Sequence, residues 1–149
     1  MIRNFFLADD DPDDTDLFEE ALKKIDKHIV LDTATNGKEL IEKLHTGNTT
    51  PEIIFLDVNM PELDGWESLK TLKQHAGLRS IPVVMYSTSA AVLDGNKAIK
   101  AGAVCYFEKP PSFVKLKDFL EKITHTSKER LVDTLKSIEA SKSHNIVVA

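Results

Sequence analysis

The side chains in this chain with the clearest potential for chemistry are acidic and lie near the N-terminus. Five of the six residues at positions 9–14 are aspartates. A helix start with a proline in its first turn explains three of them, which suit the N-cap and the first helical turn: Asp11, Asp13 and Asp14. Asp9 and Asp10 precede that helix and close an apolar run of strand length, so helix capping does not account for them.

A further carboxylate, Asp57, ends a second apolar run, at residues 53–56. Ligands of open α/β sheets bind at the carboxyl ends of the strands. If the two strands are neighbours, Asp9, Asp10 and Asp57 converge. Carboxylates about 4 Å apart repel by about 4 kcal/mol at an effective dielectric constant near 20, and a hard cation such as Mg²⁺ relieves this. The alternative is that Asp9 or Asp10 caps a loop; the matching position of Asp57 favours the metal site.

Two more polar side chains follow expected strands. Ser87 ends one apolar run, and Lys109 lies just after another. Taken singly, Ser87 suits a helix cap, and Lys109 suits a charge exposed to solvent. Together, a hydroxyl and an ammonium group could bind phosphate oxygens. Asp57 could be a metal ligand, a nucleophile toward phosphoryl groups, or both.

Composition excludes several classes of function. Lys and Arg number 19 against 24 Asp and Glu, a net charge of −5 that argues against nucleic acid as a partner. No apolar run approaches the roughly 20 residues that span a bilayer, and the N-terminus lacks the pattern of a secretory signal. The single cysteine, Cys105, excludes an internal disulfide and is expected to be an inert core residue. We therefore expect a cytoplasmic protein with no membrane partner.

Histidine positions give no sign of a hydrolytic triad. We expect all of them in helices, helix edges or tails, at the surface: His28, His45, His75, His125 and His144.

Five short apolar runs alternate with five helical patterns along the chain. Strands are expected near residues 2–8, 29–31, 53–56, 82–86 and 104–107, and helices near 17–25, 36–44, 66–72, 90–100 and 113–123. Gly95 weakens and interrupts the fourth helix. This alternation predicts a doubly wound α/β fold, with a parallel five-stranded sheet and helices on both faces. If the first and third strands are neighbours, the fold is of the flavodoxin-like (βα)5 type, with the strand order 2-1-3-4-5.

The C-terminal residues form an extension to this fold. We expect one domain over residues 1–124 and a helical extension with a tail over 125–149. Residues 126–129 resemble a capping box, and 147–149 are expected to be frayed. An apolar stripe on this helix either folds back on the domain or mediates a homodimer: Leu131, Val132, Leu135 and Ile138.

In its combination of motifs, the sequence resembles the CheY-like receiver domain of two-component response regulators. The resemblance runs from about residue 2 to 123. It is carried by Asp9-Asp10, by Asp57 within Phe-Leu-Asp-Val-Asn-Met-Pro (55–61), by Asp64-Gly65, by Ser87 after Pro-Val-Val-Met-Tyr (82–86), and by Tyr106 and Lys109-Pro110. The Asp-Pro-Asp-Asp segment (11–14) and the short C-terminal extension look most like those of stand-alone regulators associated with phytochrome kinases.

This resemblance implies a phosphorelay function. Asp57 would accept a phosphoryl group from a phosphohistidine on a sensor histidine kinase or a phosphotransfer protein. Asp9 and Asp10 would hold Mg²⁺ together with Asp57, helped by the backbone carbonyl of Asn59. Such a chain is a signalling domain that assists its own phosphorylation and dephosphorylation, and not an enzyme with a separate substrate.

The resemblance also implies a switch. Lys109 would pair with Asp57 or its phosphate, Ser87 would hydrogen-bond the phosphate, and Tyr106 would change rotamer. The Lys109–Pro110 peptide bond would be cis. The expected output surface is the fourth helix, fifth strand and fifth helix, which would bind a downstream protein that the sequence does not name.

Two other functions compete with this interpretation. A haloacid-dehalogenase-type phosphatase also uses a strand-end aspartate and Mg²⁺, but it has a second acid two residues after the nucleophile, where this chain has Asn59. Its nucleophile also follows the first strand, whereas Asp57 ends the third. A receiver-like module that works without phosphorylation is disfavoured because the set of site residues is intact.

Overall fold

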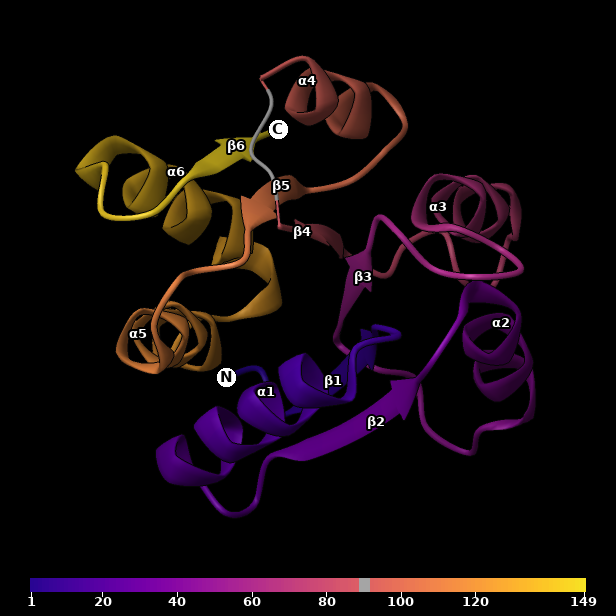
Figure 1. The fold of residues 1–149 in the computed structure, drawn as a ribbon, viewed down its shortest axis with the longest axis horizontal. Helices are drawn as coiled ribbons and strands as arrows, with labels where there is room; N and C mark the ends of the chain where they lie inside the picture. Colours follow the sequence, from indigo (N-terminus) through magenta and orange to yellow (C-terminus); the bar gives the residue numbers. More distant parts are fainter. Residues whose placement is uncertain (89–91) are drawn as a thin grey trace.

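The computed structural model describes residues 1–88 and 92–149, with the side chains of residues 92 and 93 left aside, and its centre is a six-stranded sheet (Figure 1). The strand order is β2-β1-β3-β4-β5-β6. The strands are β1 (Asn4–Ala8), β2 (Val30–Ala34), β3 (Ile53–Asp57), β4 (Val83–Ser87), β5 (Cys105–Glu108) and β6 (Ile146–Val148). The predicted order of the first five strands is confirmed, and these five are mutually parallel.

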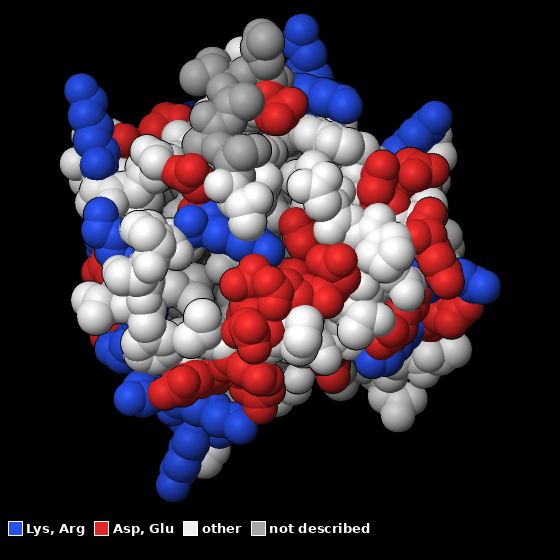
Figure 2. All heavy atoms as spheres, in the orientation of Figure 1, with Lys and Arg blue, Asp and Glu red and all other residues white. Residues whose placement is uncertain are grey.

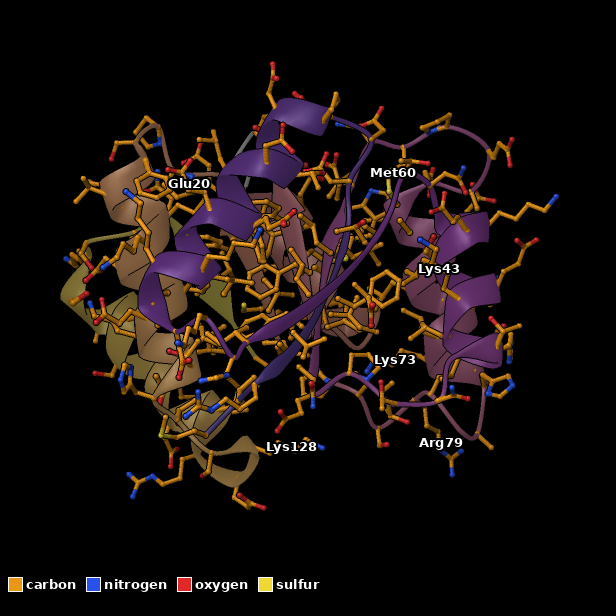
Figure 3. The ribbon with its side chains drawn as sticks, turned by 90° about the horizontal axis from the view of Figure 1, so that it is seen from below. Glu20, Lys43, Met60, Lys73, Arg79 and Lys128 are labelled. Carbon is orange, nitrogen blue, oxygen red and sulfur yellow. The ribbon has the colours of Figure 1, made fainter. Side chains whose placement is uncertain are left out.

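Helices cover both faces of this sheet (Figures 1 and 3). They are α1 (Pro12–Ile25), α2 (Gly37–Thr46), α3 (Gly65–Gln74), α4 (Val92–Lys100), α5 (Phe113–Thr124) and α6 (Leu131–Ser141). The apolar faces of α1, α5 and α6 pack into one core layer, and those of α2, α3 and α4 into the other. β3 and β4 are buried at every position, as expected for central parallel strands that are covered on both faces.

Local sequence signals explain where most helices begin. The Asp11 side chain caps α1, with Pro12 in the first helical position, as predicted. The side chains of Asn36, Asp64 and Ser112 cap α2, α3 and α5 in the same way. The predicted beginning of the fourth helix at Ala90 lies outside the described residues.

The sheet has one strand more than the sequence predicted. The prediction that residues 147–149 are frayed is wrong: β6 pairs antiparallel with β5, with Val147 opposite Tyr106. The apolar Ile-Val-Val segment is short, and the free edge of β5 supplies the backbone partners that make it a strand. Gly95 does not interrupt α4, which runs through it. A Cβ atom at Gly95 would lie 2.7 Å from Val147 Cγ2, so the glycine lets α4 pack closely on β6.

The C-terminal extension packs on the rest of the chain through α6. Leu131, Leu135 and Ile138 are buried in the core layer formed with α1 and α5, so three residues of the apolar stripe fold back. The predicted capping box is wrong, because residues 128–130 form a short 3₁₀ turn and Ser127 makes no side-chain cap. Instead, the Thr126 hydroxyl lies 2.8 Å from the Thr134 hydroxyl and connects the segment before the 3₁₀ turn to the first turn of α6.

One histidine differs from the expected surface placement. The His144 side chain is only 3% exposed, and its ring packs edge-on against Phe107 and Phe119. Its Nε2 atom lies 3.1 Å from Asp118 Oδ2 on α5. The buried imidazole therefore anchors the segment between α6 and β6 to the aromatic core.

A half-buried lysine, Lys73, holds the loop that leads from α3 into β4. Lys73 Nζ donates hydrogen bonds to the backbone carbonyls of Arg79 and Ile81, at 3.0 Å each; Lys73 and Arg79 are labelled in Figure 3. Burial lowers the pKa of Lys73. No helix in the described part of the chain is long and apolar enough to cross a bilayer.

Candidate functional site

Two neighbouring strands bring three aspartates together at one edge of the sheet. β1 pairs with β3, with Ala8 opposite Leu56, so the residues that follow these positions lie side by side. Single carboxylate oxygens of Asp9, Asp10 and Asp57 all lie within 4.8 Å of one another. Asp9 and Asp57 are buried, whereas Asp10 is exposed. The predicted convergence is confirmed, and Figure 2 shows acidic side chains gathered at the centre of this face.

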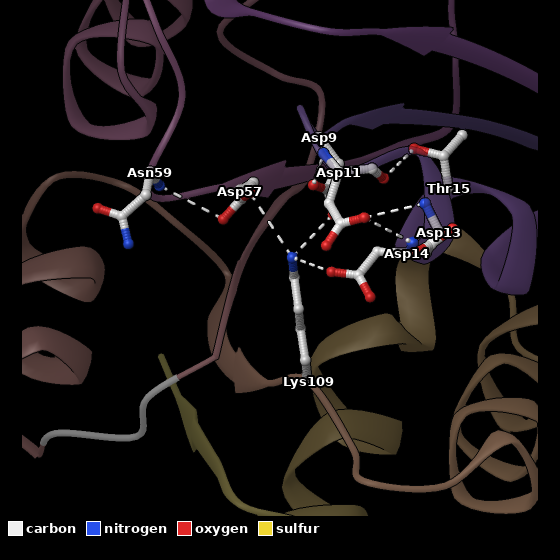
Figure 4. Close-up of polar contacts among 8 residues, drawn as sticks. All are labelled: Asp9, Asp11, Asp13, Asp14, Thr15, Asp57, Asn59 and Lys109. Atoms are coloured by element: carbon white, nitrogen blue, oxygen red, sulfur yellow. Dashed lines mark hydrogen bonds and ion pairs between the residues drawn. The ribbon is translucent and has the colours of Figure 1, made fainter.

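The Lys109 ammonium group lies among these carboxylates (Figure 4). Its Nζ atom is 2.9 Å from Asp9 Oδ2 and 3.6 Å from Asp57 Oδ2. The lysine side chain is only 10% exposed, so water screens these ion pairs weakly. The predicted pairing of Lys109 with Asp57 is present as an ion pair, although the distance is too long for a hydrogen bond.

Backbone amides fix the orientation of the two buried carboxylates. The amide of Asp11 donates to Asp9 Oδ1 at 2.9 Å, and that of Asn59 donates to Asp57 Oδ1 at 3.3 Å. Gly65, the first residue of α3, lies directly against this loop: a Cβ atom there would lie 2.3 Å from the carbonyl oxygen of Asp57. The glycine in the Asp64-Gly65 motif is therefore required by close packing behind Asp57.

The donor set of the site fits a hard divalent cation. Asp9 Oδ2 is buried and accepts no hydrogen bond, although the Lys109 charge lies beside it. A buried carboxylate oxygen without a hydrogen bond is costly unless a cation takes its lone pair. Together with oxygens of Asp10 and Asp57, it offers the all-oxygen set that Mg²⁺ and similar ions prefer.

The pKa values of the site follow from burial and charge. Burial is the main cause that raises the pKa of Asp57 to about 7; the charge of Lys109 lowers it in part, and that of Asp9 raises it again. Burial alone would lower the pKa of Lys109, but its contacts with Asp14 and Asp9 outweigh this and raise it. Lys109 is therefore charged at neutral pH, while metal-free Asp57 binds protons well above its ordinary range.

Ser87 and Lys109 lie at the ends of paired strands. Ser87 lies opposite Glu108 in the β4–β5 register, and the Lys109 amide donates to the Ser87 carbonyl at 2.6 Å. Ser87 and Tyr106 are both buried. The predicted cis bond before Pro110 is wrong: the described residues contain no cis peptide bond, so the ordinary trans preference holds here.

Two contacts at and beside the site were not predicted from the sequence. Asp14 received only a helix-dipole role, yet its Oδ2 atom accepts a hydrogen bond from Lys109 Nζ at 2.8 Å. Asn145 binds Glu108, the residue before Lys109, through its side-chain amide and its backbone carbonyl. The i+3 spacing of Asp11 and Asp14 places Asp14 on the first turn but does not reveal the lysine. For Asn145, the sequence carried no signal.

Comparison with known proteins shows the family of this chain. The response regulator receiver domain model matches residues 5–121, most of the chain. The chain belongs to this family. Receiver domains act in two-component phosphorelays: they accept a phosphoryl group on an aspartate and bind Mg²⁺ or Mn²⁺ in an acidic pocket. They interact with a histidine kinase or a phosphotransfer partner.

Curated relatives share this receiver domain within longer proteins. A protein-glutamate methylesterase/protein-glutamine glutaminase of Carboxydothermus hydrogenoformans is 34% identical over 137 residues, which cover 84% of this chain and 37% of that protein. Protein PilG of Pseudomonas aeruginosa is 34% identical over 92 residues, covering 62% of this chain and 65% of PilG. This receiver chain thus spans about a third of the methylesterase and just under two thirds of PilG.

Solved structures support both the family and its subgroup. The phosphorylated cyanobacterial phytochrome response regulator RcpA is 28% identical, with a TM-score of 0.76 over 90% of this chain and 96% of RcpA. The Mn²⁺-bound form of response regulator Rcp1 is also 28% identical, with a TM-score of 0.71 over 80% of this chain and 89% of Rcp1. The resemblance to phytochrome-associated regulators is therefore confirmed for this receiver domain.

Proposed function

We propose that Asp57 is the residue of this response regulator that accepts the phosphoryl group. The observation that carries the proposal is the convergence of Asp9, Asp10 and Asp57 within 4.8 Å, with the Lys109 ammonium 3.6 Å from Asp57 Oδ2. The donor would be a phosphohistidine on a sensor histidine kinase or a phosphotransfer protein. An Asp57 oxygen forms a bond to phosphorus as the P–N bond breaks, and the electron pair of that bond stays on the imidazole nitrogen.

The residues around Asp57 suit this transfer. Asn59 orients the carboxylate through its backbone amide, and Lys109 supplies positive charge to the phosphoryl oxygens. We assign the Mg²⁺ ligands to Asp9, Asp10 and Asp57 with the carbonyl of Asn59. A bound divalent cation would neutralise the clustered carboxylates and the charge that the phosphoryl group brings.

We also propose a switch that connects this site to the protein surface through the ends of β4 and β5. In the proposal, Ser87 and Lys109 both move toward a phosphoryl group on Asp57, which shifts the adjoining loops, and Tyr106 changes rotamer. The proposed output surface is α4, β5 and α5. β6 pairs with β5 and packs on Gly95 of α4, so it forms part of this surface. A downstream protein that binds here would contact the C-terminal extension as well.

The remaining assignments concern the whole chain. We propose a receiver domain over residues 1–124 and an extension over 125–149. The helix of this extension, α6, packs in the same core layer as α5. We also propose a cytoplasmic signalling role without a separate enzymatic activity; the receiver domain model, which describes a signalling domain, matches residues 5–121. Homodimerisation stays a proposal that analytical ultracentrifugation tests; three of the four stripe residues are already buried within the chain.

One experiment tests the phosphoryl acceptor. The protein is incubated with Mg²⁺ and acetyl phosphate, and the intact mass and the modified peptide are measured. We expect one acid-stable, base-labile phosphoryl adduct on Asp57, absent in Asp57→Asn and present in Asp16→Asn, a matched change at an exposed aspartate of α1. An adduct on another residue would falsify the assignment, and steady hydrolysis of phosphate esters would favour a phosphatase.

A further inference from the structure

The hydrogen bond of Lys109 goes to an aspartate outside the set assigned to the phosphoryl group and the metal. Lys109 Nζ donates to Asp14 Oδ2 at 2.8 Å, while Asp57 Oδ2 is 3.6 Å away (Figure 4). The contact with Asp9 Oδ2, at 2.9 Å, is an ion pair without a hydrogen bond. Asp14 therefore makes the shortest ion pair with this ammonium group, and that contact has the geometry of a charge-assisted hydrogen bond.

The helix cap of α1 fixes the position of Asp14 beside the lysine. The Asp11 cap fixes the first turn of α1, because its side chain accepts from the amides of Asp13 and Asp14. The Asp14 side chain is 28% exposed and points at Lys109, which directly follows β5. Asp13 is exposed, and its carboxylate makes no hydrogen bond or ion pair within the described residues. Two adjacent aspartates of one turn thus differ in contact with the lysine.

We propose that Asp14 is a positioning residue that holds the Lys109 ammonium on the α1 side of the site and keeps the Asp57 oxygen free to react. This inference deepens the proposed function and rests on it. A lysine side chain has many rotamers, and a fixed acceptor removes most of them before the phosphoryl donor arrives. The acceptor also draws the ammonium away from Asp57, whose lone pair must attack phosphorus.

Loss of the Asp14 charge has a defined consequence. The charged acceptors that remain near Lys109 are Asp9 and Asp57, so the ammonium is free to move onto the Asp57 carboxylate. A nucleophile engaged in a charge-assisted hydrogen bond reacts more slowly, because that bond must weaken in the transition state. The effect therefore falls on the rate constant of phosphorylation at saturating donor and Mg²⁺, and not on donor binding.

The kinetic test compares two substitutions that change net charge and helix dipole equally. In the full chain, with saturating Mg²⁺ and acetyl phosphate, we expect Asp14→Asn to phosphorylate about tenfold more slowly than the wild type. Asp13→Asn should stay within about twofold, and Asp14→Glu, whose carboxylate can still reach Nζ, should recover most of the rate. A rate for Asp14→Asn equal to that of the wild type, or to that of Asp13→Asn, overturns the inference.

A second measurement does not depend on phosphorylation. The NMR signal of a hydrogen-bonded lysine ammonium exchanges slowly with water, and the Lys109 signal is assigned by its loss in Lys109→Met. We expect that signal to broaden or disappear in Asp14→Asn and to persist in Asp13→Asn. Persistence in Asp14→Asn contradicts the positioning role even if the kinetics change. If instead the wild type takes no phosphoryl group on Asp57, the proposed function fails together with its kinetic refinement, whatever the NMR signal shows.

Discussion

Lys109 Nζ lies 3.6 Å from Asp57 Oδ2, close enough for an ion pair and too far for a hydrogen bond. Asp57 ends β3 and Lys109 directly follows β5, and β4 lies between these two strands. At this distance the charge of the ammonium acts on the carboxylate without a hydrogen bond between the two groups.

Lys109 offsets the repulsion among the buried carboxylates. Its replacement in Lys109→Met keeps most of the side-chain volume and leaves Asp9, Asp14 and Asp57 without the ammonium group. We expect the free energy of unfolding in metal-free buffer at neutral pH to fall by about 3 kcal/mol, because removal of one partner leaves buried charge uncompensated. Urea denaturation followed by circular dichroism measures this loss.

Magnesium and a surface control sharpen the Lys109 prediction. Added Mg²⁺ should restore part of the lost stability, since a cation held by the carboxylates replaces the missing charge. Lys115→Met, at an exposed position of α5, should change the stability by no more than about 0.5 kcal/mol. Equal stabilities of the two variants without metal would show that Lys109 does not offset repulsion among the carboxylates.

The raised pKa of Asp57 predicts a dependence of stability on pH. Burial raises this pKa from 3.8 to about 7 in the folded protein. Between these values the folded state binds more protons than the unfolded state. The stabilisation from the protonated carboxyl is therefore complete below pH 3.8 and is lost as the pH rises toward 7.

Asp57→Asn removes this titration without changing the shape of the side chain. In metal-free buffer, we expect the variant to gain about 3 kcal/mol relative to the wild type as the pH rises from 4.5 to 7.5. Urea denaturation at several pH values gives the difference. Parallel curves for the two proteins would contradict a raised pKa at Asp57, and an NMR titration of the carboxyl carbon gives the same value directly.

Gly95 and Val147 couple α4 to the C-terminal strand. In Gly95→Ala the new methyl group would lie 2.7 Å from Val147 Cγ2, so α4 or β6 must shift. We expect a loss of at least about 1 kcal/mol in the free energy of unfolding, because overpacking exceeds the gain in helix propensity. Thermal or urea denaturation provides the measurement.

A double-mutant cycle separates the contact between Gly95 and Val147 from propensity. In a Val147→Ala background the space is open, and Gly95→Ala should be neutral or stabilising by up to about 1 kcal/mol. Additive effects of the two substitutions would show that β6 does not pack on α4 in solution.

Much of the site was predictable because its signals are local in sequence. Asp9 and Asp57 each end an apolar run, and the topology of a parallel sheet brings the ends of neighbouring strands to one edge. The helix caps at Asp11 and Asp64 also need only a few adjacent residues. The α/β alternation therefore predicted the five parallel strands, and the three carboxylates converge once the first and third strands are neighbours.

Tertiary contacts decided the rest. Asp14 has the same local pattern as Asp13, and only the approach of Lys109, 95 residues away, makes one of them part of the site. His144 carries no core signal of its own, and β6 is an apolar run of only three residues. Their positions depend on tertiary contacts: β6 pairs with the edge of β5, and the His144 ring packs against Phe107 and Phe119. Sequence patterning determined which residues lie at the strand ends. Three-dimensional packing determined which charges meet there and what covers the last parallel strand, because those contacts join segments that no local pattern connects.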